Sequence, residues 1–290
     1  MLFFVQLEAE FVTMIRSDVG GEKMPKAIFF DLDDTLLWDK KSIELALHYT
    51  AQDAEKLLGV DSQKLIGAVR SIAPKLYAEY PTHAFTQSIG INPFEGLWGQ
   101  FGDVIHHHFR EMGNLMPNYR NRVWTEALSQ CGILSENEGN KLSELFIIHR
   151  RKQPVLYEET FEVLDWLSNQ EISMLLLTNG APSLQLEKLA ITPRLVPYFE
   201  HIVISGNVGV GKPSPAIFDH ALRLMNVQKE DVWMVGDNKK TDIMGANKIG
   251  MKSIWIEHDV KAEEQSPLNG KPDYTIKRLN ELVELIQEKN

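Results

Sequence analysis

With 290 residues, of which 43% are hydrophobic and 24% charged, the chain can bury a sizeable core as a globular protein of one large or two modest domains. Its net charge of -10 argues against nucleic-acid or anionic-membrane partners. The sequence contains no run of about 18 uncharged apolar residues, the length needed to span a bilayer. The single cysteine, Cys131, excludes an intramolecular disulfide, which fits a reducing compartment, so we expect a cytoplasmic protein. A monomer is our default assumption for the oligomeric state.

The first segment, residues 1–23, is expected to be an N-terminal extension with a mis-assigned start. Its apolar beginning lacks the basic flank of a signal peptide. Residues 20–23 (GGEK) can be encoded as a bacterial ribosome-binding site in front of an AUG for Met24. We therefore expect translation to start at Met24; the alternative is a short amphipathic helix over residues 2–15 that packs on the domain.

Six short apolar runs predict buried strands. They cover residues 27–31, 173–178, 202–205, 232–235, 253–256 and, more weakly, 274–276. Helical patterns at 161–169, 182–190, 215–225 and 241–249 alternate with these runs. Because such an alternation implies a parallel sheet covered on both faces, we predict an α/β, Rossmann-like doubly wound core.

Residues 42–154 are helical in pattern and contain no clear strand. We predict helices at 43–58, 61–80, 97–110, 117–131 and 137–150, and we expect Pro74 to kink or split the second of them. A turn-rich segment with aromatic residues, 80–96, either connects two helices or presents residues that select a ligand. His106, His107 and His108 would point in different directions on a helix and could not chelate one metal ion together.

Four short segments of the predicted core carry polar residues that suit one site. They contain Asp31 and Asp33, then Thr178 and Asn179, then Lys212, and finally Asp237 and Asp242. The carboxyl ends of parallel strands converge at one edge of a sheet, where ligands usually bind. Residues i and i+2 of an extended segment point to the same side, so the first two carboxylates could share that site.

These residue types suit the hydrolysis of a phosphate ester. A carboxylate can attack phosphorus and form an aspartyl-phosphate, which splits one difficult hydrolysis into two easier steps. A Mg2+ ion held by oxygen ligands, one lysine and hydroxyl or backbone donors would neutralise the charge that keeps a carboxylate away from a phosphate dianion. A second carboxylate can protonate the leaving oxygen and then deprotonate the attacking water.

The four segments resemble the motifs of the haloacid dehalogenase (HAD) superfamily, in particular those of its phosphatases. The resemblance rests on DLDDTL from Asp31, TNG from Thr178, GKPSPAIF from Gly211, and GDN from Gly236 running on to TDIMGA from Thr241. It extends over the chain from about Met24 to the C-terminus, although its specificity lies in these core segments.

The resemblance implies a role for each residue. Asp31 would be the nucleophile and Asp33 the general acid/base. Thr178, with Asn179 beside it, would bind the phosphoryl group, which Lys212 would bridge to the nucleophile. The metal site would take Asp31, the backbone carbonyl of Asp33, Asp237 and, as a ligand or next to one, Asp242.

A helical insertion at this point resembles the C1 cap of the superfamily, which closes over the site, excludes water and selects the leaving group. The predicted division is an extension (1–23), a catalytic core (24–41 and 155–290) and an all-helical cap (42–154). Basic cap residues could meet a substrate carboxylate or a second phosphate, or could be ordinary solvated side chains. They are Arg110, Arg120, Arg122, Arg150, Arg151 and Lys152.

The leading hypothesis is a Mg2+-dependent phosphomonoesterase of a small metabolite. Phosphoserine is the first guess for the substrate, with phosphoglycolate, a sugar phosphate or a nucleotide as alternatives. Every motif residue also has a structural alternative as a turn former, helix cap or surface side chain, which we prefer only for Asp34.

Three other functions are weaker. A haloacid dehalogenase needs neither the second acid nor a metal, so Asp33 and the pair Asp237 and Asp242 argue against it. A signalling receiver domain is much smaller and places its acidic pair before the phosphorylated Asp. The intact set of motifs argues against a non-catalytic phosphate-binding protein on the same scaffold, and an activity assay is needed to exclude it.

Overall fold

The computed structural model describes residues 23–104, 106–258 and 270–289. Its centre is a six-stranded, all-parallel sheet with the order β3-β2-β1-β4-β5-β6. Each predicted strand is confirmed, with its ends shifted by one residue at most. The strands are β1 (Ala27–Phe30), β2 (Ser173–Thr178), β3 (His201–Ile204), β4 (Val232–Gly236), β5 (Lys252–Ile256) and β6 (Tyr274–Ile276).

The direction in which strands are added reverses at β1. From this central strand the chain adds β2 and β3 on one side, and then β4, β5 and β6 on the other. In open parallel sheets, ligands bind beyond the carboxyl ends of the strands at the point where the order switches. The carboxyl ends of β1, β2 and β4 therefore mark the expected position of a site.

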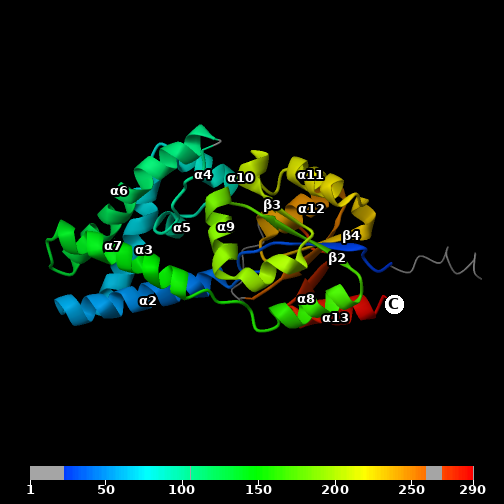
Figure 1. Cartoon of the computed structure of the whole chain (residues 1–290), viewed down its shortest axis with the longest axis horizontal. Coiled ribbons are helices and arrows are strands. Elements are labelled where there is room, and N and C mark those ends of the chain that lie inside the picture. The colour runs from blue at the N-terminus through cyan, green and yellow to red at the C-terminus, as the bar shows by residue number, and fades with distance from the viewer. Residues whose placement is uncertain (1–22, 105, 259–269, 290) are drawn as a thin grey trace, which may run out of the picture.

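Alternate residues of β1 enter the cores on the two faces of the sheet, as strand geometry requires. Ile28 and Phe30 belong to the same apolar cluster as residues of α8 (Thr160–Asn169) and α13 (Asn280–Gln287). Ala27 and Phe29 belong to that of α11 (Pro215–Met225) and α12 (Met244–Ile249). Helices thus cover both faces (Figure 1), and the predicted doubly wound α/β fold is confirmed.

The remaining elements of the core are short. The helix predicted at 241–249 is the five-residue π-helical turn η3 (Lys239–Ile243) followed by α12. The other elements are α9 (Pro182–Ile191), α10 (Ser205–Val208), η1 (Pro193–Tyr198) and η2 (Lys229–Asp231).

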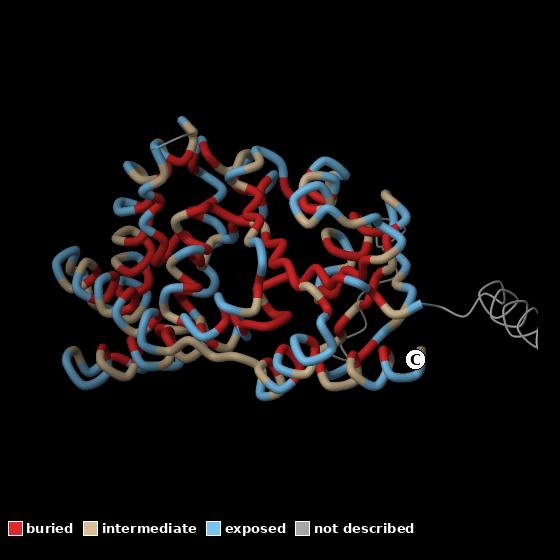
Figure 2. Tube along the Cα trace, turned by 45° about the vertical axis from the view of Figure 1, so that its right-hand side comes forward, coloured by how far each residue is buried: buried red, intermediate tan, exposed pale blue. Residues whose placement is uncertain are grey.

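Of the helices between β1 and β2, the first six form the helical cap, at the left of Figure 1, and the last, α8, packs on the sheet. The six cap helices have an apolar cluster of their own, built around large buried side chains such as Trp98, Tyr119, Trp124 and Phe146. Figure 2 shows this second group of buried segments beside that of the sheet. The helices are α2 (Asp39–Leu58), α3 (Ser62–Ala78), α4 (His83–Ile89), α5 (Pro93–Gly96), α6 (His107–Gln130) and α7 (Glu136–Lys152).

The predicted cap helix 97–110 is wrong over most of its length, whereas the one predicted at 117–131 is confirmed but begins ten residues earlier. Residues 97–104 are not helical: Phe101 has a φ of 48°, and Gly99 and Gly102 weaken any helix there. A single helix, α6, instead begins at His107 and continues through Pro117. The burial of apolar residues on both sides of this proline keeps the helix intact despite the lost hydrogen bond.

Pro74 likewise does not split α3, which runs unbroken from Ser62 to Ala78 with Ile72, Ala73 and Leu76 buried around it. The turn-rich segment 80–96 contains the two short helices α4 and α5. The domain boundaries at 41/42 and 154/155 stay predictions.

Residues 1–22 lie outside the described residues, and so does the helix predicted over 2–15. The start at Met24 stays a prediction. Within the described ranges, no helix combines the length and the apolarity needed to cross a bilayer.

Candidate active site

The loop after β1 places two carboxylates at the switch point of the sheet. The amide of Asp31 still donates to the carbonyl of Val235, at 3.0 Å, so this residue continues the pairing of β1 with β4. The amides of Leu36 and Leu37 then donate to the carbonyl of Leu32, which closes a tight turn. Asp33 therefore projects from a short, internally hydrogen-bonded loop beside Asp31.

Lys212 brings together residues from three of the predicted motifs. Its ammonium lies 2.5 Å from Oδ1 of Asp31 and 2.8 Å from Oδ1 of Asp242, and it donates to the carbonyl of Leu177 at 2.6 Å. Burial alone would lower the pKa of Lys212, but the two carboxylates outweigh that effect and raise it. The lysine is thus a buried, fully charged cation at the sheet edge.

Asn179 holds the backbone of this lysine in place. Its Oδ1 accepts from the amide of Lys212 at 2.8 Å, and its Nδ2 donates to the carbonyl of Lys212 at 2.9 Å. Both polar ends of the side chain are therefore used within the protein. The structure gives Asn179 a positioning role for the lysine loop.

Three carboxylates form a cluster that suits a metal ion. Asp31, Asp237 and Asp242 each offer an oxygen, and these oxygens all lie within 4.8 Å of one another. Burial, followed by the charges of Asp31, Asp242 and Asp34, raises the pKa of Asp237 well above its usual value. A hard divalent cation prefers carboxylate oxygens and would relieve this repulsion, so the residues present fit Mg2+.

Among the described residues, this is the one cluster with the composition and spacing of a metal site. The three consecutive histidines do not belong to it. His106 is the N-cap of α6 and accepts from the amide of His108 at 3.3 Å, and its ring stacks on Phe85.

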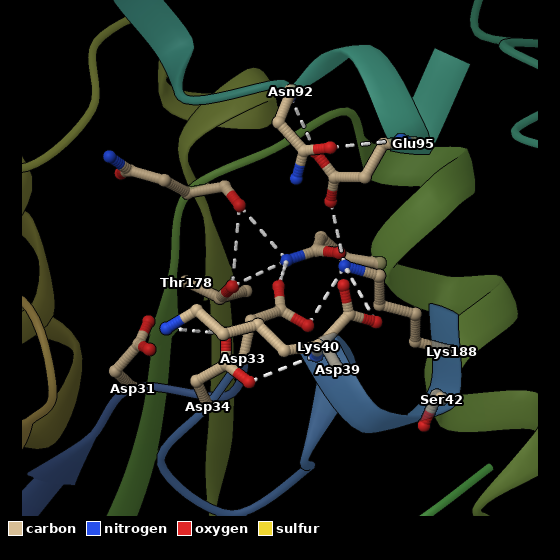
Figure 3. Close-up of polar contacts among 12 residues, drawn as sticks. Asp31, Asp33, Asp34, Asp39, Lys40, Ser42, Asn92, Glu95, Thr178 and Lys188 are labelled. Atoms are coloured by element: carbon tan, nitrogen blue, oxygen red, sulfur yellow. Dashed lines mark hydrogen bonds and ion pairs between the residues drawn. The ribbon is translucent and has the colours of Figure 1, made fainter. Parts of the chain in front are cut away.

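Asp33 is held by two residues that were not predicted as site residues, Gln185 and Lys188 of α9. Gln185 Nε2 donates to Oδ2 of Asp33 at 2.9 Å and to the hydroxyl of Thr178 at 2.5 Å. Lys188 Nζ donates to Oδ1 of Asp33 at 2.8 Å and to Oε1 of the cap residue Glu95 at 2.7 Å (Figure 3). Desolvation raises the pKa of Asp33 to about 6, against the opposing effect of Lys188.

The sequence around these residues indicated their local structure only. Gln185 and Lys188 are three residues apart on a helix that starts directly after the Thr178 motif, so they share one helix face. Asn92 and Glu95 have the spacing of a capping box, and the structure contains that box at the start of α5. Both patterns indicate local structure; neither indicates a partner distant in the chain.

Of the predicted site residues, all but Thr178 line one pocket of about 230 Å³. The cap closes one side of it with Gly90, Asn92 and Glu95, and the first turn of α2 contributes Lys40. The core side of the lining is mostly acidic. It consists of Asp31, Asp33, Asp34, Asp39, Asn179, Lys212, Asp237, Asn238, Thr241 and Asp242. Thr178 lies behind this surface, buried against Gln185.

None of the six basic cap residues is among the described residues that line this pocket. Arg150 is fully buried, pairs with Asp39 and lies 4.5 Å from the centre of the Trp98 ring. Arg151 pairs with Glu187 of α9 at 2.6 Å. Several of these cations therefore stabilise the cap and its contact with the core.

Comparison with known proteins agrees with the fold and with the predicted family. Residues 25–250 match the sequence profile of the haloacid dehalogenase-like hydrolases. The chain is 32% identical over 257 residues to the phosphoserine phosphatase of Thermus thermophilus, covering 89% of this chain and 97% of that protein. It is 28% identical over 265 residues to the glyceraldehyde 3-phosphate phosphatase of Pyrococcus furiosus, covering 91% and 94% of the two chains.

A similar fold is found in the magnesium-bound HAD-hydrolase YfnB of Bacillus subtilis. Its TM-score is 0.60 at 21% identity, over 91% of this chain and all of that chain. At this identity the likeness concerns the fold.

Proposed function

The chain belongs to the haloacid dehalogenase-like hydrolases and is a hydrolase of phosphoric monoesters, and from that premise we propose that it removes phosphate from a small metabolite with the help of Mg2+. One observation carries the proposal: Asp31, paired with Lys212, faces the same pocket as Asp33 and the carboxylates of Asp237 and Asp242. A nucleophile, an acid/base and a metal site are thereby available at one place.

In the proposed first step, an oxygen of Asp31 attacks the phosphorus of the bound ester. The P–O bond to the leaving group breaks as the aspartyl-phosphate forms, and Asp33 gives its proton to the leaving oxygen. The ammonium of Lys212, 2.5 Å from Asp31, keeps the carboxylate ionised and oriented, and it offsets the charge of the incoming phosphate.

In the second step, Asp33 takes a proton from a water molecule that attacks the aspartyl-phosphate. The bond between phosphorus and Asp31 breaks, inorganic phosphate leaves, and Asp33 is again protonated. Mg2+ held by Asp31, Asp237, Asp242 and the backbone carbonyl of Asp33 would supply positive charge to the phosphate oxygens. The pKa of about 6 suits Asp33 to give and take a proton near neutral pH.

We propose phosphoserine as the first substrate to test. The relative from Thermus thermophilus, 32% identical, is a phosphoserine phosphatase, and a pocket of about 230 Å³ suits a small ester. Lys40, which pairs with Asp34 at 3.3 Å, lies in the pocket lining together with several acids, and we propose that these groups meet the carboxylate and the ammonium of phosphoserine. Glyceraldehyde 3-phosphate, the substrate named for the Pyrococcus furiosus relative, is the main competitor.

We further propose that the protein acts in the cytoplasm, as a monomer, on free metabolites. Its net charge of -10 disfavours nucleic acids and anionic membranes, and its single cysteine is compatible with a reducing compartment.

The test is release of inorganic phosphate from phosphoserine, glyceraldehyde 3-phosphate, phosphoglycolate, a sugar phosphate and a nucleoside monophosphate, with and without Mg2+. We expect Mg2+-dependent release with the highest kcat/KM for phosphoserine. A higher kcat/KM for another ester would replace the substrate and keep the chemistry. No release from any ester, together with release of halide from a 2-haloacid, would overturn the proposal.

A further inference from the structure

Helix α9 of the core makes several contacts with the cap. Ser183, in its first turn, donates from its amide and its hydroxyl to the carboxylate of Asp103. Leu184 belongs to the apolar cluster of the cap. Glu187 pairs with Arg151 of α7 at 2.6 Å. The same helix also carries Lys188, so the docked cap and the acid/base Asp33 meet on one rigid element.

Lys188 is enclosed by three carboxylates, two from the segment that follows β1 and one from the cap. Its side chain is fully buried, and its ammonium lies 2.8 Å from Asp33, 2.7 Å from Glu95 and 3.8 Å from Asp39. A buried ammonium is costly unless it is paired, so this lysine holds its partners in a fixed arrangement. Since Gln185 binds the second oxygen of Asp33, both oxygens of the acid/base are held by α9.

Glu95, the cap partner of Lys188, is itself fixed by the loop that closes the pocket. Its Oε2 accepts from the amide of Asn92 at 2.8 Å, and the side chain of Asn92 caps α5 in return. Asn92 and Gly90 line the pocket opposite the acid/base (Figure 3 shows Asn92, Glu95, Lys188 and Asp33). A displaced cap would therefore remove one of the two close carboxylate partners of Lys188.

We propose that Lys188 is a positioning residue that sets Asp33 for proton transfer and makes this placement depend on the docked cap through Glu95. The inference rests on the proposed function, because it assigns Lys188 a part in the acid/base step of that reaction. Lys188 does not touch the reacting atoms; it acts through Asp33.

The choice of leaving group separates this role from a merely structural one. An alkoxide, as from phosphoserine, needs a proton from Asp33 to leave, whereas p-nitrophenolate leaves without one. Because kcat/KM covers only the steps up to the first irreversible one, it reports transfer of the phosphoryl group to Asp31 for both esters. The ratio of the two values, measured on one preparation, is also independent of the fraction of active enzyme.

The experiment measures this ratio, phosphoserine over p-nitrophenyl phosphate, in the full chain with Mg2+. General acid catalysis contributes typically about 10²- to 10⁴-fold, so we expect Lys188→Met to lower the ratio by about 10²-fold. Lys188→Arg should recover part of it, because the positive charge is kept. An alkyl ester that proves to be the better substrate replaces phosphoserine in the ratio.

Glu95 supplies the test of the coupling to the cap. Glu95→Leu should lower the same ratio, by less than Lys188→Met does, and the double variant should lose no more than Lys188→Met alone. The double variant also removes a buried carboxylate that Lys188→Met leaves unpaired, so it serves where the single variant folds poorly.

Glu187→Gln is the matched control. It breaks another ion pair between cap and core on the same helix, next to Lys188, without a contact to Asp33. We expect its ratio to equal that of the wild type. Equal losses for both esters in Lys188→Met, or a ratio lowered as much by Glu187→Gln, would overturn the inference. A wild type inactive on both esters would instead overturn the proposed function, and the inference with it.

Discussion

The ammonium of Lys212 lies 2.5 Å from Oδ1 of Asp31, although 181 positions separate the two residues in the chain. The same ammonium lies 2.8 Å from Asp242, so one buried cation is shared by carboxylates of two different motifs. The contact exists because β1 lies between β2 and β4 in the sheet. The first three predictions follow from this arrangement.

Asp31→Asn should abolish turnover and leave the fold intact. The amide cannot attack phosphorus as a carboxylate does, while Lys212 keeps its contacts with Asp242 and the carbonyl of Leu177. The measurements are phosphate release and circular dichroism. Asp231→Asn, at a surface pair with Lys26, is the control and should keep full activity. Substantial residual turnover in Asp31→Asn would refute the nucleophile assignment.

Lys212→Met should lower the free energy of unfolding by about 3–5 kcal/mol, because it leaves two buried carboxylates without their partner. The measurement is urea denaturation at neutral pH. The control is Lys26→Met, which removes an exposed ion pair with Asp231 and should cost less than about 1 kcal/mol. A cost for Lys212→Met as small as that of the control would contradict the prediction.

Removal of Mg2+ should abolish activity and also lower stability. At a Mg2+ concentration 100 times the Kd, binding to the folded state adds about 2.7 kcal/mol, seen as a higher Tm. Asp237→Asn should change the Tm in opposite directions without and with Mg2+. Without metal it should raise the Tm, since it relieves the repulsion among Asp237, Asp31 and Asp242. With Mg2+ it should melt below the wild type. An unchanged Tm of the wild type on adding Mg2+ would argue against the site.

Glu95 should make stability depend on pH. Burial, against the opposing effect of Lys188, raises the pKa of Glu95 from 4.5 to about 7. Between these values the folded state binds the proton more tightly than the unfolded state, so this contribution to stability is complete below 4.5 and is lost as the pH rises through 7.

Glu95→Gln does not titrate, and its free energy of unfolding should therefore fall less than that of the wild type across this window. Urea denaturation at a series of pH values gives both curves. Parallel curves for the two proteins would show that the pKa of Glu95 is not raised on folding.

Gly90→Ala should impair catalysis as well as stability. Gly90 has a φ of +82°, and a Cβ atom there would lie 2.9 Å from Cβ of Asn179, the residue that holds the backbone of Lys212. Gly59→Ala is a close control, since Gly59 also ends a helix at positive φ but has open space around it.

Each alanine should cost about 1 kcal/mol of stability from its left-handed backbone. Only Gly90→Ala should also lower kcat/KM, by about tenfold, because a small displacement of catalytic groups is enough for that. The measurements are urea denaturation and phosphate release. The same kcat/KM in both variants would contradict the prediction.

The strands and motif residues could be predicted from the sequence because local patterns encode them. A short apolar run such as 173–178 forms a strand buried on both faces, and polar residues at its end lie at the sheet edge. The helix boundaries of the cap were harder. Pro117 and Pro74 indicated breaks, but burial of the surrounding apolar residues outweighs the local cost of proline.

The residues that hold Asp33 could not be identified from the sequence. Lys188 is 155 positions from Asp33 and 93 from Glu95, and nothing in the local pattern of α9 says which carboxylates its ammonium meets. The sequence by itself thus determined the strands and the places of the motif residues at the strand ends, because both depend on neighbours along the chain. Only the tertiary structure decided how the cap docks on α9 and which carboxylates pair with Lys188. A buried lysine pairs with the carboxylates that the packing of distant elements brings near it, and that packing depends on the whole fold.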